Sequence, residues 1–182
     1  MPVHVRTIRC EAARIGDDHL EVTGRLADER PPGGPRWFGV DQSALIHDMT
    51  VTISVRYPDL VVTAARGTMT SHPYTICTDA VPPLGELVGL SVARGFTRAV
   101  NERFGRQRGC AHLTALIHAM APVVRQAAGV AFRGESAPPR ADADHWFVNT
   151  CQAWREGGPL HARLEANDLE GLKALSARRR PA

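Results

Sequence analysis

The residues best suited to chemistry stand in the run Gly109-Cys110-Ala111-His112-Leu113, directly before a long segment of helical apolar periodicity. Two residues apart on a helix are separated by about 200° of rotation, so one of Cys110 and His112 must belong to a turn if both face one point. Gly109 permits such a turn, and the free amide groups of a helix start favour a thiolate. We therefore predict that Cys110 is a metal ligand or a nucleophile. His112 is then a second ligand or an acid/base group.

His47 and Asp48 form a second candidate pair, at the start of the clearest strand. Successive side chains of a strand point to opposite faces, and His47 extends the apolar row that continues through Met49 and Val51. A histidine on the core side needs a hydrogen-bond partner, a metal or a cavity. We expect His47 to be a metal ligand. Asp48 is then an acid/base group, or a partner that orients a ligand, if the backbone bends there.

An arginine cluster precedes the Gly-Cys turn. Arg94 and Arg98 are one helical turn apart and form a fork that suits the carboxylate or phosphate of a substrate. The net charge of +3 comes from residues 170–182, so the preceding chain is neutral in sum. Because aromatic residues make up only 5% of the chain, few side chains could stack on bases. We predict a small anionic metabolite as partner and no nucleic acid.

Three functions are compatible with these residues. The first is an enzyme, a hydrolase or lyase, that holds zinc or iron through His47, Cys110 and His112 and acts on the anionic metabolite. The second is a non-catalytic metal or iron-sulfur carrier that uses Cys77, Cys110, Cys151 and a histidine. The third is a metal-free thiol enzyme with Cys110 as its nucleophile. A purely structural module is the remaining alternative.

The elements that must position these residues fall into two halves. Apolar and polar residues alternate over 19–26 and 49–57, which predicts strands, and hairpin partners are expected over 3–10 and 61–67. Helical periodicity follows over 84–88, 96–104 and 113–128, and a last helix is expected from Pro159 to Leu175. Pro122 is expected to kink or split the third helix. Strands first and helices after predict an α+β fold, with an N-terminal antiparallel sheet of about four strands packed against three to four helices.

The sequence also predicts one domain over residues 1–182, interrupted by two loops. The first loop, 29–43, contains prolines and glycines that break the strand pattern, and the second covers 133–144. Residues 177–182 are expected to be a disordered basic tail. The four cysteines are scattered without a C-x-x-C pair, and no signal peptide or long apolar run is evident. We therefore expect a cytoplasmic protein with reduced thiols and no membrane segment, which could form a homo-oligomer.

Taken together, the motifs resemble a bacterial family known only as a domain of unknown function. In that family a His-Asp-Met strand start precedes a Gly-Cys-Thr-His-Leu helix start, and this chain has Ala111 where the threonine stands. The likeness covers roughly residues 4 to 156 and brings no established reaction, cofactor or substrate. It also includes the early Asp28. The resemblance implies that six residues recur together, namely His47, Asp48, Cys77, Cys110, His112 and Cys151.

Overall fold

The computed structural model describes residues 2–30, 44–132, 145 and 147–176. The chain divides into two compact units, residues 1–132 and 133–182, and each is described by itself. A single domain over the whole chain therefore stays a prediction. Of the expected loop 29–43, Glu29 belongs to a strand and residues 31–43 lie outside the described residues. The expected loop 133–144 and the expected tail 177–182 also lie outside them.

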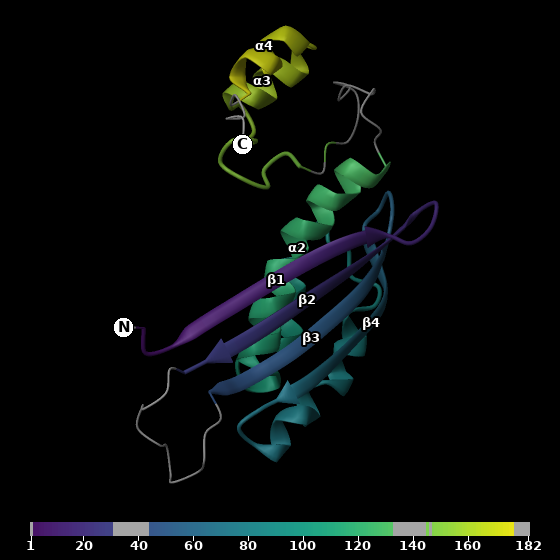
Figure 1. Ribbon diagram of the computed structural model, residues 1–182. Helices are drawn as coiled ribbons and strands as arrows, with labels where there is room; N and C mark the ends of the chain where they lie inside the picture. Colours follow the sequence, from purple (N-terminus) through teal and green to yellow (C-terminus); the bar gives the residue numbers. More distant parts are fainter. Residues whose placement is uncertain (1, 31–43, 133–144, 146, 177–182) are drawn as a thin grey trace. The chain divides into compact units, whose positions relative to one another are not determined.

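The first unit contains a four-stranded antiparallel sheet, with its strands in the order β1-β2-β3-β4. Successive strands are neighbours, so the sheet is a simple meander of hairpins, drawn from purple to blue in Figure 1. This sheet, with the helices that follow it, confirms the predicted α+β arrangement. The strands are β1 (Val5–Arg14), β2 (His19–Glu29), β3 (Leu45–Arg56) and β4 (Val61–Ser71).

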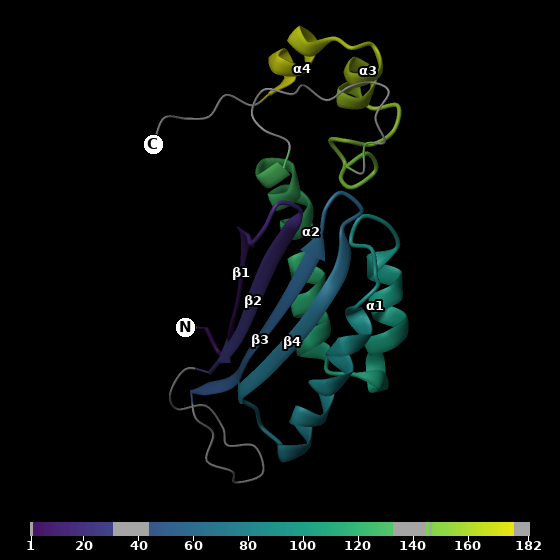
Figure 2. The same cartoon turned by 90° about the vertical axis from the view of Figure 1, so that its right-hand side faces the viewer.

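Helices cover one face of this sheet (Figure 2). The main one is α2 (Ala111–Phe132), which contacts β2 and β1, and α1 (Phe96–Phe104) packs beside it. Three short 3-10 helices connect these elements: η2 (Thr75–Ala80), η3 (Pro82–Leu87) and η4 (Arg106–Arg108). α2 continues through Pro122, so the expected split does not occur. Its neighbours Ala121 and Val124 are buried, and this packing holds the helix on both sides of the proline.

The core lies between the sheet and α2. The alternation predicted for β2 and β3 is confirmed, because their even-numbered and odd-numbered residues, respectively, are buried on the helix side. Gly24 marks the closest approach of the two layers: a Cβ there would lie 2.8 Å from Leu116 Cδ1 and 2.9 Å from Met120 Cγ. The missing side chain lets the helix rest directly on the middle of β2. The start of α2 is thereby brought over one end of the sheet.

The described residues of the second unit form two short helices, α3 (Pro159–Glu165) and α4 (Leu169–Leu175). The prediction of one helix from Pro159 to Leu175 is wrong at Asn167. This residue has a left-handed φ of 52°, which ends the first helix. Asp168 then begins the second helix by accepting a hydrogen bond from Gly171 N at 2.8 Å.

By length and composition alone, α2 is the one described helix that could cross a membrane. This is a weak indication, because the core helix of a soluble protein meets the same criteria. The absence of a membrane segment stays a prediction.

The close approach at Gly24 can be tested by mutation. Gly24→Ala should lower the free energy of unfolding by about 1–3 kcal/mol, because the added methyl group overpacks the contact with α2. Gly16→Ala in the β1–β2 turn is the control, since nothing lies within 4 Å of a Cβ at Gly16. Urea unfolding followed by circular dichroism measures both. Equal stability of the two variants would show that α2 does not rest on β2 in this way.

Candidate metal centre

A carboxylate is completely buried near the end of β2, on the face that α2 covers. Asp28 continues the apolar row of β2 beyond Leu26 and is 0% exposed. Its register partners are Arg6 on β1 and His47 on β3. Residues paired across neighbouring strands point to the same face, so the three polar side chains form a row across the sheet. The row adjoins the apolar core, because Leu26 on β2 and Met49 on β3 precede and follow it on the same face of the sheet.

Among the described residues, four side chains contact the Asp28 carboxylate. Arg6 donates from Nε to Oδ1 at 2.7 Å and from Nη2 to Oδ2 at 2.8 Å, as a bidentate pair. His4 Nε2 lies 3.2 Å from Oδ1, and His47 Nδ1 lies 3.0 Å from Oδ2. From the first turn of α2, His112 places Nε2 at 3.3 Å from the same Oδ2. A buried carboxylate needs partners of this kind, because burial without them costs several kcal/mol.

Three of these residues have the spacing of a metal site. One ligand atom each of Asp28, His47 and His112 lies within 4.8 Å of the others. Metal bonds of about 2.0–2.2 Å to nitrogen and oxygen, at tetrahedral or octahedral angles, place neighbouring donor atoms roughly 3.0–3.5 Å apart. The distances of 3.0 and 3.3 Å from Oδ2 to the two imidazole nitrogens fall in this range. Two imidazoles and a carboxylate suit zinc or ferrous iron.

The protonation states of the cluster also suit a metal. The hydrogen bonds from Arg6 lower the pKa of Asp28 to about 2, against the opposing effect of its burial, so the carboxylate is ionised. Burial lowers the pKa of His47, although Asp28 opposes this. Burial also lowers the pKa of His112, and the neighbouring His47 adds to the effect. Both rings are therefore neutral at pH 7, and a neutral imidazole is the form that binds metal.

Cys110 reaches the cluster through His112. It stands directly before α2, and its Sγ lies 3.6 Å from His112 Nδ1, the ring nitrogen opposite the one that faces Asp28. The backbone turn there requires Gly109, because a Cβ would lie 2.8 Å from the Phe104 carbonyl oxygen. The Thr114 hydroxyl donates to the carbonyls of Phe104 and Cys110 at 3.1 and 3.0 Å, which fixes the turn. Cys110 is not a member of the three-ligand group.

The structure does not bring Asp48 to this cluster. Because side chains alternate along β3, the carboxylate of Asp48 lies on the opposite face from His47. There it accepts hydrogen bonds from Arg25 Nε at 2.7 Å and from Arg25 Nη2 at 2.9 Å. The hydrogen bond from Arg25 lowers the pKa of Asp48. This pair stabilises the outer face of the sheet.

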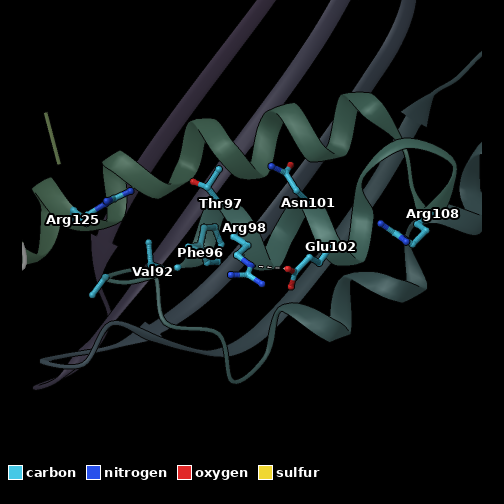
Figure 3. A pocket seen from close by; sticks show the side chains of 10 residues that line it. Val92, Phe96, Thr97, Arg98, Asn101, Glu102, Arg108 and Arg125 are labelled. Carbon is cyan, nitrogen blue, oxygen red and sulfur yellow. Dashed lines mark hydrogen bonds and ion pairs between the residues drawn. The ribbon is translucent and has the colours of Figure 1, made fainter. Parts of the chain in front are cut away.

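The predicted arginine fork also lies elsewhere. Arg98 pairs with Glu102 at 2.7 Å, and both line a pocket beside α1 (Figure 3). The residues that line this pocket do not include Asp28, His47, His112 or Cys110. Arg94 is exposed in the segment before α1. The two arginines are therefore not part of the cluster.

The remaining cysteines do not join the group either. Cys77 lies half-buried in η2, and Cys151 is an exposed residue of the second unit. Among the described residues, a ligand group of three or more His, Cys, Asp or Glu side chains forms only around Asp28. The site predicted from the sequence therefore keeps His47 and His112 but places a carboxylate where a thiolate was expected.

Sequence reasoning did not assign roles to Asp28, Arg6 and His4. A signal for Asp28 was present, because the apolar row from Leu20 to Leu26 continues with a period of two onto a charged residue. An acid at a core position of a strand needs a partner. Finding Arg6 required the register of the β1–β2 hairpin, which turn residues alone did not fix.

Fold and site define an α+β protein with a buried Asp-His-His cluster between an antiparallel sheet and the start of its core helix. The chain belongs to the family described as protein of unknown function (DUF2889), whose sequence profile matches residues 4–126. Asp28, His47, His112 and Cys110 lie within this match, and Cys151 lies beyond it. The resemblance to a domain of unknown function is thus confirmed, and its specific motifs and the bacterial origin stay predictions. Neither the curated proteins nor the solved structures contain a match.

The buried carboxylate leads to a prediction for metal-free protein. Asp28→Asn should lower the free energy of unfolding at pH 7 by about 2 kcal/mol, the amount that corresponds to the lowered pKa. The folded-state pKa lies below the usual 3.8, so this contribution is present above about pH 4 and is lost as the pH falls toward 2. Denaturant unfolding at pH 7, 4 and 2, with chelator present, measures it.

Asp48→Asn is the matched control, because Asp48 also forms a bidentate pair with an arginine, but the two side chains are 15% and 59% exposed, against 0% and 39% in the pair of Asp28 with Arg6. Exposed pairs contribute less to stability, so the loss should be smaller. Equal losses in the two variants would contradict the special role of Asp28.

Proposed function

We propose that this protein is a metal-dependent enzyme, a hydrolase or lyase, that binds zinc or iron through Asp28, His47 and His112 and acts on a small anionic metabolite. The observation that carries the proposal is the convergence of two neutral imidazoles on one oxygen of a buried, ionised carboxylate. Such a set leaves further coordination positions for water or substrate. When bound, the metal supplies a Lewis acid and an activated water molecule.

Counting donors around Asp28 supports a cation there. A carboxylate has about four lone-pair sites. Arg6 contacts it twice and His4, His47 and His112 once each, so the partners exceed these sites. Both imidazoles compete for Oδ2 on top of the Arg6 contact. If Asp28, His47 and His112 held a metal ion, this competition would be removed, because ring nitrogens that act as ligands need no proton.

Cys110 has a defined part in this arrangement. When Nε2 of His112 is the ligand atom, the ring carries its proton on Nδ1. This N–H group then donates a hydrogen bond to Cys110 Sγ at 3.6 Å. A hydrogen bond to the far nitrogen holds a ligating imidazole in the correct tautomer and orientation. The thiol group thus orients His112.

Arg6 and His4 suit the anionic part of a substrate. Their side chains are 39% and 43% exposed, whereas Asp28 is fully buried. Arg6 uses Nε and Nη2 on the carboxylate, and its other N–H groups can donate to a carboxylate or phosphate next to the metal. In this proposal Arg6 takes the role that the sequence assigned to Arg94 and Arg98.

Metal content tests the proposal directly. Protein purified without chelator should contain close to one zinc or iron per chain by elemental analysis, and Asp28→Asn or His112→Ala should lose most of it. Loss of a partner that only orients a ligand lowers metal affinity by about 10–100-fold, so loss of a ligand itself should lower it at least as much. His19→Ala is the control, because His19 also pairs with an aspartate, Asp18 at 2.6 Å, but in the β1–β2 turn.

The same measurement separates the carrier alternative. Cys77→Ser and Cys151→Ser should keep the metal, since neither thiol belongs to the ligand group. Loss of metal from these two variants, with Asp28→Asn unaffected, would overturn the proposed site in favour of a thiolate carrier.

The thiol enzyme is a second candidate, favoured by one specific observation. Cys110, His112 and Asp28 are aligned as thiol, imidazole and carboxylate, with 3.6 Å from Sγ to Nδ1 and 3.3 Å from Nε2 to Oδ2. This is the order in which a nucleophile, a general base and an orienting acid stand in hydrolytic triads. In this case the protein needs no metal.

Alkylation distinguishes this second candidate. In a thiol enzyme Cys110 should react with iodoacetamide faster than Cys77 in metal-free folded protein, and His112→Ala should slow the reaction by about tenfold because the base is lost. Mass spectrometry of tryptic peptides measures both rates. A rate at Cys110 that is unchanged by His112→Ala would eliminate the triad.

A further inference from the structure

A pocket of about 630 Å³ lies beside α1 and does not include the metal-type cluster. This volume suits a small organic ligand. The pocket is lined by the segment before α1, by residues of α1 from Phe96 to Glu102, by Arg108 and by Arg125 on α2. Val92 and Phe96 give it an apolar side, and both are buried.

The charged groups of this pocket are unbalanced. Three guanidinium groups and one carboxylate line it, those of Arg98, Arg108, Arg125 and Glu102. Glu102 pairs with Arg98 at 2.7 Å. Among the described residues, no carboxylate forms an ion pair with Arg108 or Arg125. Within the same residues, the side chain of Arg125 forms only one hydrogen bond, a weak one from Nε to the Ala121 carbonyl of its own helix at 3.5 Å. Within the described part of the chain, neither Arg108 nor Arg125 therefore has an ion-pair partner, and Arg108 has only a Coulombic interaction with Glu102, which is already bound to Arg98.

The partial burial of Arg125 also favours an anion beside it. The side chain is partly buried, and desolvation lowers its pKa, although an arginine remains charged at neutral pH. A partly desolvated guanidinium is stabilised when a carboxylate or phosphate pairs with it. The uncapped start of α1 contributes in the same direction, since Gly95 and Phe96 line the pocket and no side chain caps the helix.

The two unpaired arginines stand at opposite ends of the pocket. Figure 3 shows Arg125 at one end and Arg108 at the other, with their guanidinium groups turned toward the middle, where Arg98 and Glu102 lie. A single inorganic anion would contact only one of them. A ligand with a negative group at each end and an apolar middle contacts both, with the middle on Val92 and Phe96.

We propose that this pocket binds an elongated organic dianion, with terminal carboxylate or phosphate groups held by Arg108 and Arg125. The site is separate from the cluster around Asp28, so its ligand is a second substrate or an effector. Glu102 limits the affinity by occupying Arg98.

Calorimetric titration of the full-length protein tests this site with defined probes: succinate, adipate, sebacate, hexane-1,6-diyl bisphosphate and the monoanion hexanoate. At least one longer dicarboxylate, or the bisphosphate, should bind about tenfold more tightly than succinate and hexanoate, because two charged ends are engaged at once. Arg108→Gln and Arg125→Gln should each weaken that probe by about tenfold. The better of the two kinds of probe tells whether carboxylate or phosphate is preferred.

Two further variants exclude trivial explanations. Glu102→Gln should tighten binding by about threefold, because it frees Arg98, and misfolding cannot produce a gain. Arg103→Gln should bind as the wild type does, since Arg103 donates to the Ala99 carbonyl and does not line the pocket. No binding of any dianion, binding of hexanoate that is as tight as that of every dianion, or equal losses in the Arg103 and Arg108 variants would overturn the proposal.

Discussion

The buried negative charge of Asp28 is the constraint on which the site depends. A carboxylate that is 0% exposed must be matched by donors from several elements, and it receives them from β1, β3 and α2. The bidentate pair with Arg6 keeps the carboxylate ionised, and burial keeps the two imidazoles neutral. The same set of contacts therefore ties one end of the sheet to the start of the core helix and prepares three ligand atoms for a cation.

The packing of the core makes this possible. Gly24 lets α2 lie directly against the middle of β2, and Gly109 with Thr114 fixes the turn from which the helix begins. His112 is thereby held over the row of Arg6, Asp28 and His47. The position of the cluster thus depends on two glycines. A Cβ at Gly24 would crowd the side chains of α2, and a Cβ at Gly109 would crowd the backbone of Phe104.

Much of the fold could be predicted from the sequence, and about half of the site. Period-two alternation identified β2 and β3 and placed His47 on the core face, because a strand has only two faces. The same alternation excludes Asp48 from that face. Asp28 and Arg6 could be joined only by the register of the β1–β2 hairpin, which is a long-range property. The break at Asn167 depended on a single left-handed residue that periodicity does not detect.

X-ray absorption spectroscopy of the protein loaded with one equivalent of zinc tests the central claim most directly, because it reports which atoms bind the metal. Ligation by Asp28, His47 and His112 predicts only nitrogen and oxygen neighbours, at about 2.0–2.2 Å, with the outer-shell scattering of two imidazoles. A sulfur neighbour at about 2.3 Å would show that a cysteine binds the metal and would contradict the proposed ligand set. Failure of the folded protein to bind zinc or ferrous iron would contradict it as well.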